Sequence, residues 1–127
     1  MSRIAWITDI HLNFAEDEVV ESFLQQLQRT QADALLCSGD IGESTDVITY
    51  LSRMAGEIPC PLYFVLGNHD FYLGAIRTVR QQVQALCEQQ PSLHYLTMSD
   101  VFSLDEDISV IGHDGWADGR IGDYQGS

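Results

Sequence analysis

Short apolar runs recur along the first half of the chain, and polar or turn-forming residues bound each of them. The runs at residues 4–8, 34–37 and 62–66 are continuous rather than alternating. Continuous runs of this length are typical of strands that are covered on both faces in a parallel sheet. Each run therefore predicts a buried strand.

Segments with apolar residues at helical spacing follow these strands. The spacing predicts helices over 17–30, from a cap at Ser44 or Thr45 to about Gly56, and over 76–86. The order strand, helix, strand, helix, strand, helix implies parallel strands joined by right-handed crossovers. The fold class is therefore predicted to be α/β.

The last third of the chain has a different pattern. Short strand candidates lie at 94–96, 101–104 and 108–111, and the acidic residues 105–107 predict a hairpin tip. Residues 112–127 are rich in Gly and Asp, which indicates a loop or a chain end. The length of 127 residues fits one domain over 1–127.

A polar cluster follows each of the three predicted parallel strands. The clusters are Asp9-Ile10-His11, Gly39-Asp40 and Gly67-Asn68-His69-Asp70. Because ligands bind outside the carboxyl ends of strands in open α/β sheets, we expect the clusters to converge, although about thirty residues separate them. Their side chains would then share one site.

The clusters combine carboxylate, imidazole and amide oxygen. These ligand types hold two divalent ions side by side, and carboxylates leave the ions Lewis acidic enough to activate water. Taken singly, an Asp-x-His or a Gly-Asp is also explained by a turn that caps a helix. The occurrence of all three clusters in order, each at a strand end, favours a binuclear metal site.

Charge and cysteine content restrict the partners and the location. Six Lys and Arg against nineteen Asp and Glu give a formal net charge of −13, which repels nucleic acid and anionic membranes. No apolar run approaches the length of a signal peptide core or a membrane span. Cys37, Cys60 and Cys87 lack metal-binding spacing, so we expect reduced cysteines in a cytoplasmic protein without membrane partners.

In these clusters the sequence resembles the calcineurin-like metallophosphoesterases. The motifs of that family run Asp-x-His, Gly-Asp, Gly-Asn-His-Asp/Glu, a lone His and Gly-His-x-His, and the resemblance extends from Asp9 to about Trp116. It implies the N-terminal half of a four-layer α/β/β/α sandwich, with a mainly parallel sheet, flanking helices and a final β-hairpin.

The resemblance also implies a ligand set. Asp9 and His11 would bind the first of two divalent ions, such as Mn, Fe or Zn. Asp40 would bridge both ions, and Asn68 would bind the second.

Two further residues receive catalytic roles from the same resemblance. His69 would be the nonligating histidine near the phosphoryl group, and Asp70 would orient it. The implied reaction is hydrolysis of a phosphoester bond by a metal-bound hydroxide that attacks phosphorus in line, as in a phosphatase or phosphodiesterase.

The late motifs of the family are missing from the chain. Gly112-His113-Asp114-Gly115 begins like the last motif but has Gly115 in place of its second His. We therefore interpret His113 as a polar loop residue rather than a ligand, and His94 as structural or exposed. Trp116 either packs the loop on the sheet or faces substrate. The chain is expected to be the front part of a longer phosphoesterase.

An incomplete site and an incomplete sandwich have consequences for the chain by itself. We expect it to bind at most one metal ion weakly and to hydrolyse phosphodiesters negligibly. Because one sheet face is left uncovered, we also expect self-association, by packing of sheet faces or by strand exchange, or poor solubility. The alternative is a noncatalytic metal-binding or protein-interaction domain derived from that fold. A Rossmann-like nucleotide binder ranks last, because no GxGxxG or GxxxxGK[ST] follows a strand. The class of phosphorylated substrate is not defined by the sequence.

Overall fold

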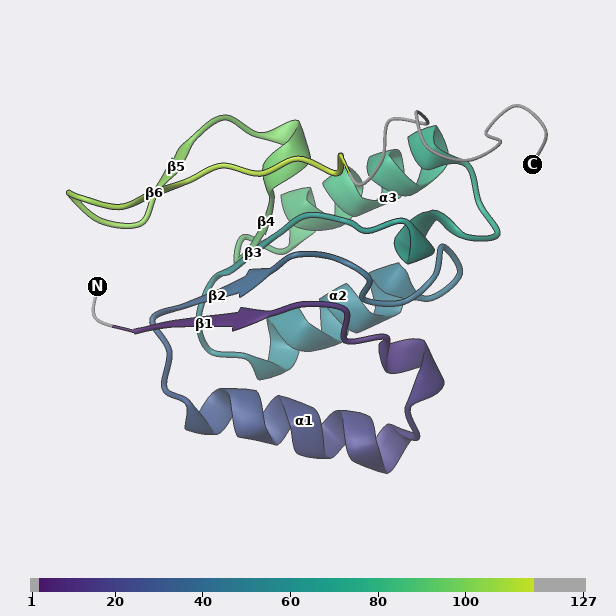
Figure 1. Cartoon of the computed structure of the whole chain (residues 1–127), viewed down its shortest axis with the longest axis horizontal. Helices are drawn as coiled ribbons and strands as arrows, with labels where there is room; N and C mark the ends of the chain where they lie inside the picture. Colours follow the sequence, from purple (N-terminus) through teal and green to yellow (C-terminus); the bar gives the residue numbers. More distant parts are fainter. Residues whose placement is uncertain (1–2, 116–127) are drawn as a thin grey trace.

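The computed structural model describes residues 3–115, which form one four-stranded sheet, three α-helices and a short hairpin (Figure 1). The elements are, in chain order, β1 (Ile4–Ile7), η1 (Leu12–Phe14), α1 (Asp17–Arg29), β2 (Ala34–Cys37), α2 (Val47–Glu57), β3 (Leu62–Phe64), η2 (His69–Phe71), α3 (Ile76–Gln89), β4 (Leu93–Tyr95), η3 (Leu96–Met98), β5 (Phe102–Ser103) and β6 (Ser109–Val110). Those marked η are single 3-10 turns.

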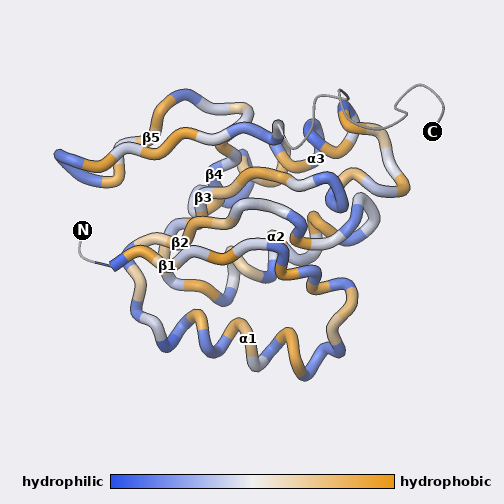
Figure 2. The backbone as a smooth tube through the Cα atoms, in the orientation of Figure 1, coloured by the Kyte–Doolittle hydropathy of each residue, from blue (hydrophilic) through white to orange (hydrophobic). Residues whose placement is uncertain are grey.

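The main sheet is parallel throughout, in the order β1-β2-β3-β4. Since each right-handed crossover moves the chain one strand in the same direction, the three helices all pack on one face (Figure 1). Leu24, Leu51 and Val83, one from each helix, are fully buried in the core on that face. Figure 2 shows hydrophobic and hydrophilic residues alternating along α1, as expected for a helix with one buried side.

The structure confirms the predicted fold class, a mainly parallel α/β arrangement that ends in a hairpin. The strand expected over 94–96 is β4, which adds a fourth parallel strand beside β3. At the predicted hairpin tip, the Asp105 carboxylate accepts hydrogen bonds from the backbone N–H groups of Asp107 and Ile108. No helix within residues 3–115 is long and apolar enough to cross a membrane.

The start of α2 differs from the prediction that Ser44 or Thr45 caps it. The N-cap residue is Asp46, and its carboxylate accepts a hydrogen bond of 2.7 Å from the Glu43 backbone N–H, in the turn before the helix. Ser44 instead donates its backbone N–H to the Tyr72 carbonyl, which ties this turn to the loop after β3. Tertiary contacts between two loops therefore decide where the helix begins.

The expectation that β1 is covered on both faces is wrong. Trp6 is 71% exposed and Ile4 is 39% exposed, because both lie on the face opposite the helices. The hairpin covers that face only near β3, where Phe102 and Val110 pack near Tyr63. An apolar groove of about 300 Å³ is left on the sheet, and its lining includes Trp6, Leu36, Tyr63, Val65, Leu96 and Ile111.

Candidate metal centre

The first two polar clusters are brought together by the backbone. Beyond the ends of β1 and β2 the two loops stay hydrogen-bonded to each other, since the Asp9 N–H donates to the Gly39 carbonyl and the His11 N–H to the Asp40 carbonyl, at 3.0 and 2.9 Å. Two segments that are distant in sequence therefore run side by side at the carboxyl edge of the sheet.

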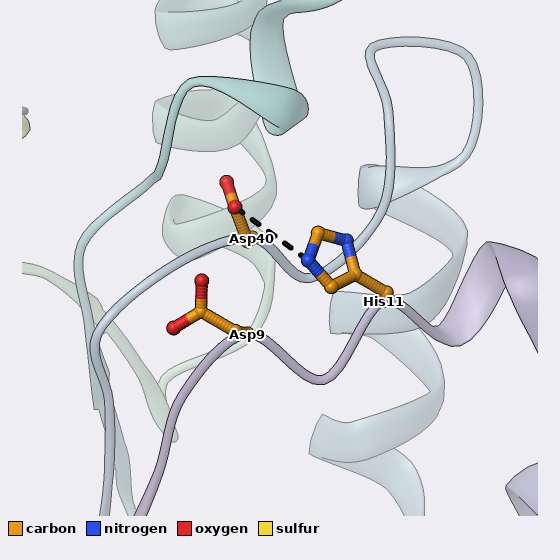
Figure 3. A group of neighbouring side chains, drawn as sticks. All are labelled: Asp9, His11 and Asp40. Atoms are coloured by element: carbon orange, nitrogen blue, oxygen red, sulfur yellow. Dashed lines mark ion pairs between the residues drawn. The ribbon is translucent and has the colours of Figure 1, made fainter.

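The side chains of Asp9, His11 and Asp40 point into a common space (Figure 3). One ligand atom from each lies within 4.8 Å of the others. Nε2 of His11 is 3.6 Å from Oδ2 of Asp40, too far for a good hydrogen bond. Two donors that each lie about 2.1 Å from one ion are separated by about 3.0–3.6 Å, so the separation of these two atoms fits a shared metal ion.

The charges of the group support the same interpretation. Nε2 of His11 faces the Asp40 carboxylate, so a shared ion would lie on that side of the ring, while the buried Nδ1 atom on the other side has no hydrogen-bond partner among the described residues. The carboxylates of Asp9 and Asp40 also lie close enough to repel each other, and a cation between them would offset that repulsion.

All three residues adopt left-handed backbone conformations. The φ angles are 53° at Asp9, 41° at His11 and 54° at Asp40. Such angles are uncommon outside glycine and each costs on the order of 1–3 kcal/mol, so they persist where the surrounding structure enforces them and cluster at functional sites. Of the five non-glycine residues with positive φ in the described part of the chain, three therefore belong to the candidate metal group, and the other two are Gln31 and Leu73.

Two glycines allow the second and third clusters to approach. Gly39 has φ 101°, and a Cβ atom at this position would lie 2.5 Å from the backbone N of Gly67. A Cβ atom on Gly67 would in turn collide with the carboxylate of Asp40. A side chain at either position would push the loops apart.

The third cluster lies directly beside Asp40. The backbone N–H of His69 donates to Oδ1 of Asp40 at 3.0 Å, and the rings of His69 and His11 are 4.8 Å apart, edge to face. The amide nitrogen of Asn68 donates to the Tyr72 hydroxyl at 3.1 Å. This bond orients the amide and leaves the Asn68 oxygen available as a ligand.

Asp70 is completely buried beneath this site. Its carboxylate accepts four backbone hydrogen bonds of 2.8–2.9 Å, three from the N–H groups of Asp40, Ile41 and Gly42 and one from Gly67. Burial raises the pKa of Asp70 to about 6, although these four donors lower it. None of these four hydrogen bonds involves the His69 ring. The Asp70 carboxylate therefore joins the loop after β2 to the loop after β3.

Among the described residues, His94 and His113 do not belong to the candidate metal group of Asp9, His11 and Asp40. His94 lies on β4, stacked on Tyr63 with the ring centroids 4.7 Å apart, which agrees with a structural role. His113 is exposed in the loop after β6. Trp116 lies outside the described residues.

Asp114 is a buried residue that the sequence reasoning missed. Its carboxylate accepts hydrogen bonds from the Leu66 backbone N–H at 2.7 Å, from the Arg80 guanidinium at 3.2 Å and from the Tyr95 hydroxyl. Burial and this contact raise the pKa of Tyr95 well above its usual range. Asp114 thus anchors the loop after β6 to the end of β3, just before Gly67.

Two aromatic residues at the site were also missed. Phe14 lies three residues after His11, and Tyr72 lies three residues after His69, and their rings contact those histidines at 5.6 and 4.4 Å. Each pair spans one 3-10 turn, in which residues three apart lie on the same side. The spacing was visible in the sequence, but the 3-10 turns were not predicted.

The three cysteines are free and do not contribute to the site. Burial raises the pKa of the Cys37 thiol to about 12 and that of Cys87 to about 11, and it also raises the pKa of Cys60. A thiol with a raised pKa stays protonated at neutral pH and is a poor metal ligand.

Comparison with known proteins identifies relatives of this arrangement. A model of the calcineurin-like phosphoesterase family matches residues 2–125. The UDP-2,3-diacylglucosamine hydrolase of Stenotrophomonas maltophilia (strain K279a) is 35% identical over 81 residues, which cover 54% of this chain and 33% of that protein. The enzyme of the same name from Yersinia enterocolitica is 32% identical over 97 residues, 67% of this chain and 40% of that protein. The matched segments thus span 33–40% of the length of these relatives.

Proposed function

The chain belongs to the calcineurin-like phosphoesterase family, and from this premise we propose that it is part of a metal-dependent hydrolase of phosphoester bonds. The observation that supports this proposal most strongly is the convergence of Asp9, His11 and Asp40 within 4.8 Å. The spacing and chemistry of these donors suit a divalent ion such as Mn, Fe or Zn.

The proposed centre has two ions that share Asp40. Asp9 and His11 complete the ligands of the first ion in this chain, and Asn68 contributes an amide oxygen to the second. When bound, such ions supply Lewis acidity at the phosphoryl group and activate water. Because the second ion receives only two ligands from these clusters, we expect the chain by itself to hold one ion weakly and to turn over substrate negligibly.

His69 would act on the substrate without binding metal. Its ring lies 4.8 Å from the His11 ring, at the edge of the metal group, where it can stabilise charge on a phosphoryl oxygen or give a proton to the leaving group. Asp70 would act through the loops, because its four hydrogen bonds hold the backbone of Asp40 and Gly67 in place.

The substrate class can be tested with the protein in full length. The relatives are named as hydrolases of UDP-2,3-diacylglucosamine, so the panel should contain a UDP-linked acylated sugar beside simple phosphomonoesters and phosphodiesters. Each compound is assayed with Mn²⁺, Fe²⁺ and Zn²⁺. The proposal requires metal-dependent hydrolysis of at least one of them, and failure with every compound and metal would count against it. The net charge of −13 argues against long nucleic acids as the substrate. The three free cysteines fit the proposed cytoplasmic location.

We also expect the chain to self-associate through the open sheet face. The groove lining contains no Asp, Glu, Lys or Arg, so two acidic chains can meet there without placing like charges in contact. Trp6, which is 71% exposed, would become buried in such a contact.

Sedimentation velocity measures this association. The sedimentation coefficient of the unmodified chain should rise with concentration, whereas Trp6→Ser should sediment as a monomer. Val101→Ser is the control, because Val101 is also exposed but does not line the groove. A monomeric unmodified chain at all concentrations would contradict the expectation.

A further inference from the structure

Four rings form a continuous row across the candidate metal centre. The ring centroids of Phe14 and His11 are 5.6 Å apart, those of His11 and His69 are 4.8 Å apart, and those of His69 and Tyr72 are 4.4 Å apart. The two histidines occupy the middle of the row, and an aromatic residue stands at each end. The ends of the row are benzene-type rings, one of them with a hydroxyl group, and its centre consists of the two imidazoles.

The two outer rings are held in the same way. The backbone N–H of Phe14 donates to the His11 carbonyl, and that of Tyr72 donates to the His69 carbonyl, both at 3.0 Å. The Tyr72 hydroxyl also accepts the hydrogen bond from the Asn68 amide. The tight local turns thus fix the backbone of Phe14 and Tyr72 relative to the two histidines, and both rings lie beside them.

Packing of the fold does not explain these rings. In the two turns the buried apolar positions belong to Leu12 and Phe71, which are 3% and 5% exposed. Phe14 and Tyr72 are 70% and 44% exposed, and the neighbouring Leu73 is 82% exposed. Exposed apolar side chains that surround a polar site are typical of a surface that binds a ligand.

We propose that Phe14 and Tyr72 form an aromatic rim that binds an aromatic group attached to the phosphoryl group of the substrate. This inference rests on the proposed function, because the metal group must hold the phosphoryl end. Aromatic rings attract one another in stacked or edge-to-face arrangements at centroid separations of about 4.5–7 Å, which rings beside His11 and His69 can offer. The proposed substrate is therefore a phosphoester that carries a flat aromatic ring.

Binding of two phosphonates to the Mn²⁺-saturated chain tests the rim. Phenylphosphonate and methylphosphonate share the group that faces the metal and differ in the ring, and ³¹P relaxation gives both dissociation constants. The phenyl compound should bind about three- to tenfold more tightly, as one to two aromatic contacts provide. The double variant Phe14→Ala, Tyr72→Ala should reduce the ratio of the two affinities to about one. Tyr72→Phe keeps the ring and should keep the preference, as should the control Ile111→Ala on the open sheet face.

The outcomes separate the rim from the proposed function. Equal affinities for both phosphonates in the unmodified chain, with Mn²⁺ bound, would overturn the rim and leave the metal site standing. An unchanged preference in the double variant would also overturn it, and so would hexylphosphonate binding as tightly as the phenyl compound. If the chain binds no Mn²⁺, the same comparison is made on the full-length protein, and a full-length protein that binds none would overturn the proposed function and the rim together.

Discussion

Replacing Asp40 by Asn is expected to weaken Mn²⁺ binding to the chain by about 100-fold or more. Asp40 lies within 4.8 Å of both Asp9 and His11, and its Oδ2 faces Nε2 of His11 at 3.6 Å. The substitution removes a negative charge and one of the two carboxylates of the group, and loss of a supporting residue alone typically costs about 10–100-fold in metal affinity. Electron paramagnetic resonance of free Mn²⁺ during a titration gives the affinity.

The matched control is Asp107→Asn, which makes the same chemical change at the exposed hairpin tip. Its Mn²⁺ affinity should equal that of the unmodified chain. If Asp40→Asn binds Mn²⁺ as well as Asp107→Asn does, the ion is not held by this group of residues and the assignment of Asp40 is wrong.

Replacing His69 by Ala is expected to lower the turnover of the full-length protein by about 10²- to 10⁴-fold while leaving its metal content unchanged, since this is the typical contribution of a positioned acid or base. The contact of His69 with Asp40 is made by its backbone N–H, which the substitution preserves. Steady-state hydrolysis and metal analysis of the same samples separate the two effects.

His94→Ala is the control for this variant. His94 stacks on Tyr63 in the sheet and is separate from the metal group, so its removal should not change turnover per folded molecule. Loss of both metal ions together with activity in His69→Ala would show that His69 is a ligand, which would reverse the proposed roles.

The order of strands and helices could be predicted from the sequence because apolar runs and amphipathic segments alternate regularly along it. The continuous apolar runs that became β1, β2 and β3, with amphipathic segments between them, fix parallel strands and crossovers. The coverage of β1 could not be predicted in the same way. An apolar run looks the same whether its second face is buried or open, and Trp6 is 71% exposed on a face that the described elements leave uncovered.

The convergence of the metal group could also be predicted, since strand ends of one parallel sheet meet at one edge. The conformations that complete the site could not. The left-handed angles at Asp9, His11 and Asp40 are uncommon outside glycine, and they occur where hydrogen bonds join the two loops. Of these features, only the close approach of the loops after β2 and β3 is marked locally in the sequence, because Gly39 and Gly67 stand where the two loops touch.

The role of Asp70 shows a different limit of sequence reasoning. Its position next to His69 suggests a partner for that ring, yet its carboxylate faces inward and binds backbone N–H groups around Asp40 and Gly67. Adjacent residues in a tight turn point in different directions, so neighbours in sequence need not be partners in space. Asp114, far along the chain from Asp70, is tied to the same strand end through Leu66, and no local pattern marks such a contact.

The central claim is that divalent metal at Asp9, His11 and Asp40 is required to hydrolyse a phosphoester bond. The most direct measurement is phosphodiester hydrolysis by the full-length protein before chelation, after chelation and after Mn²⁺ is returned. We expect turnover to disappear on chelation and to return with Mn²⁺ in the unmodified protein but not in Asp40→Asn. Turnover that survives complete removal of metal would contradict the account. Absence of turnover in a protein that holds its metal ions firmly would favour the noncatalytic metal-binding domain instead.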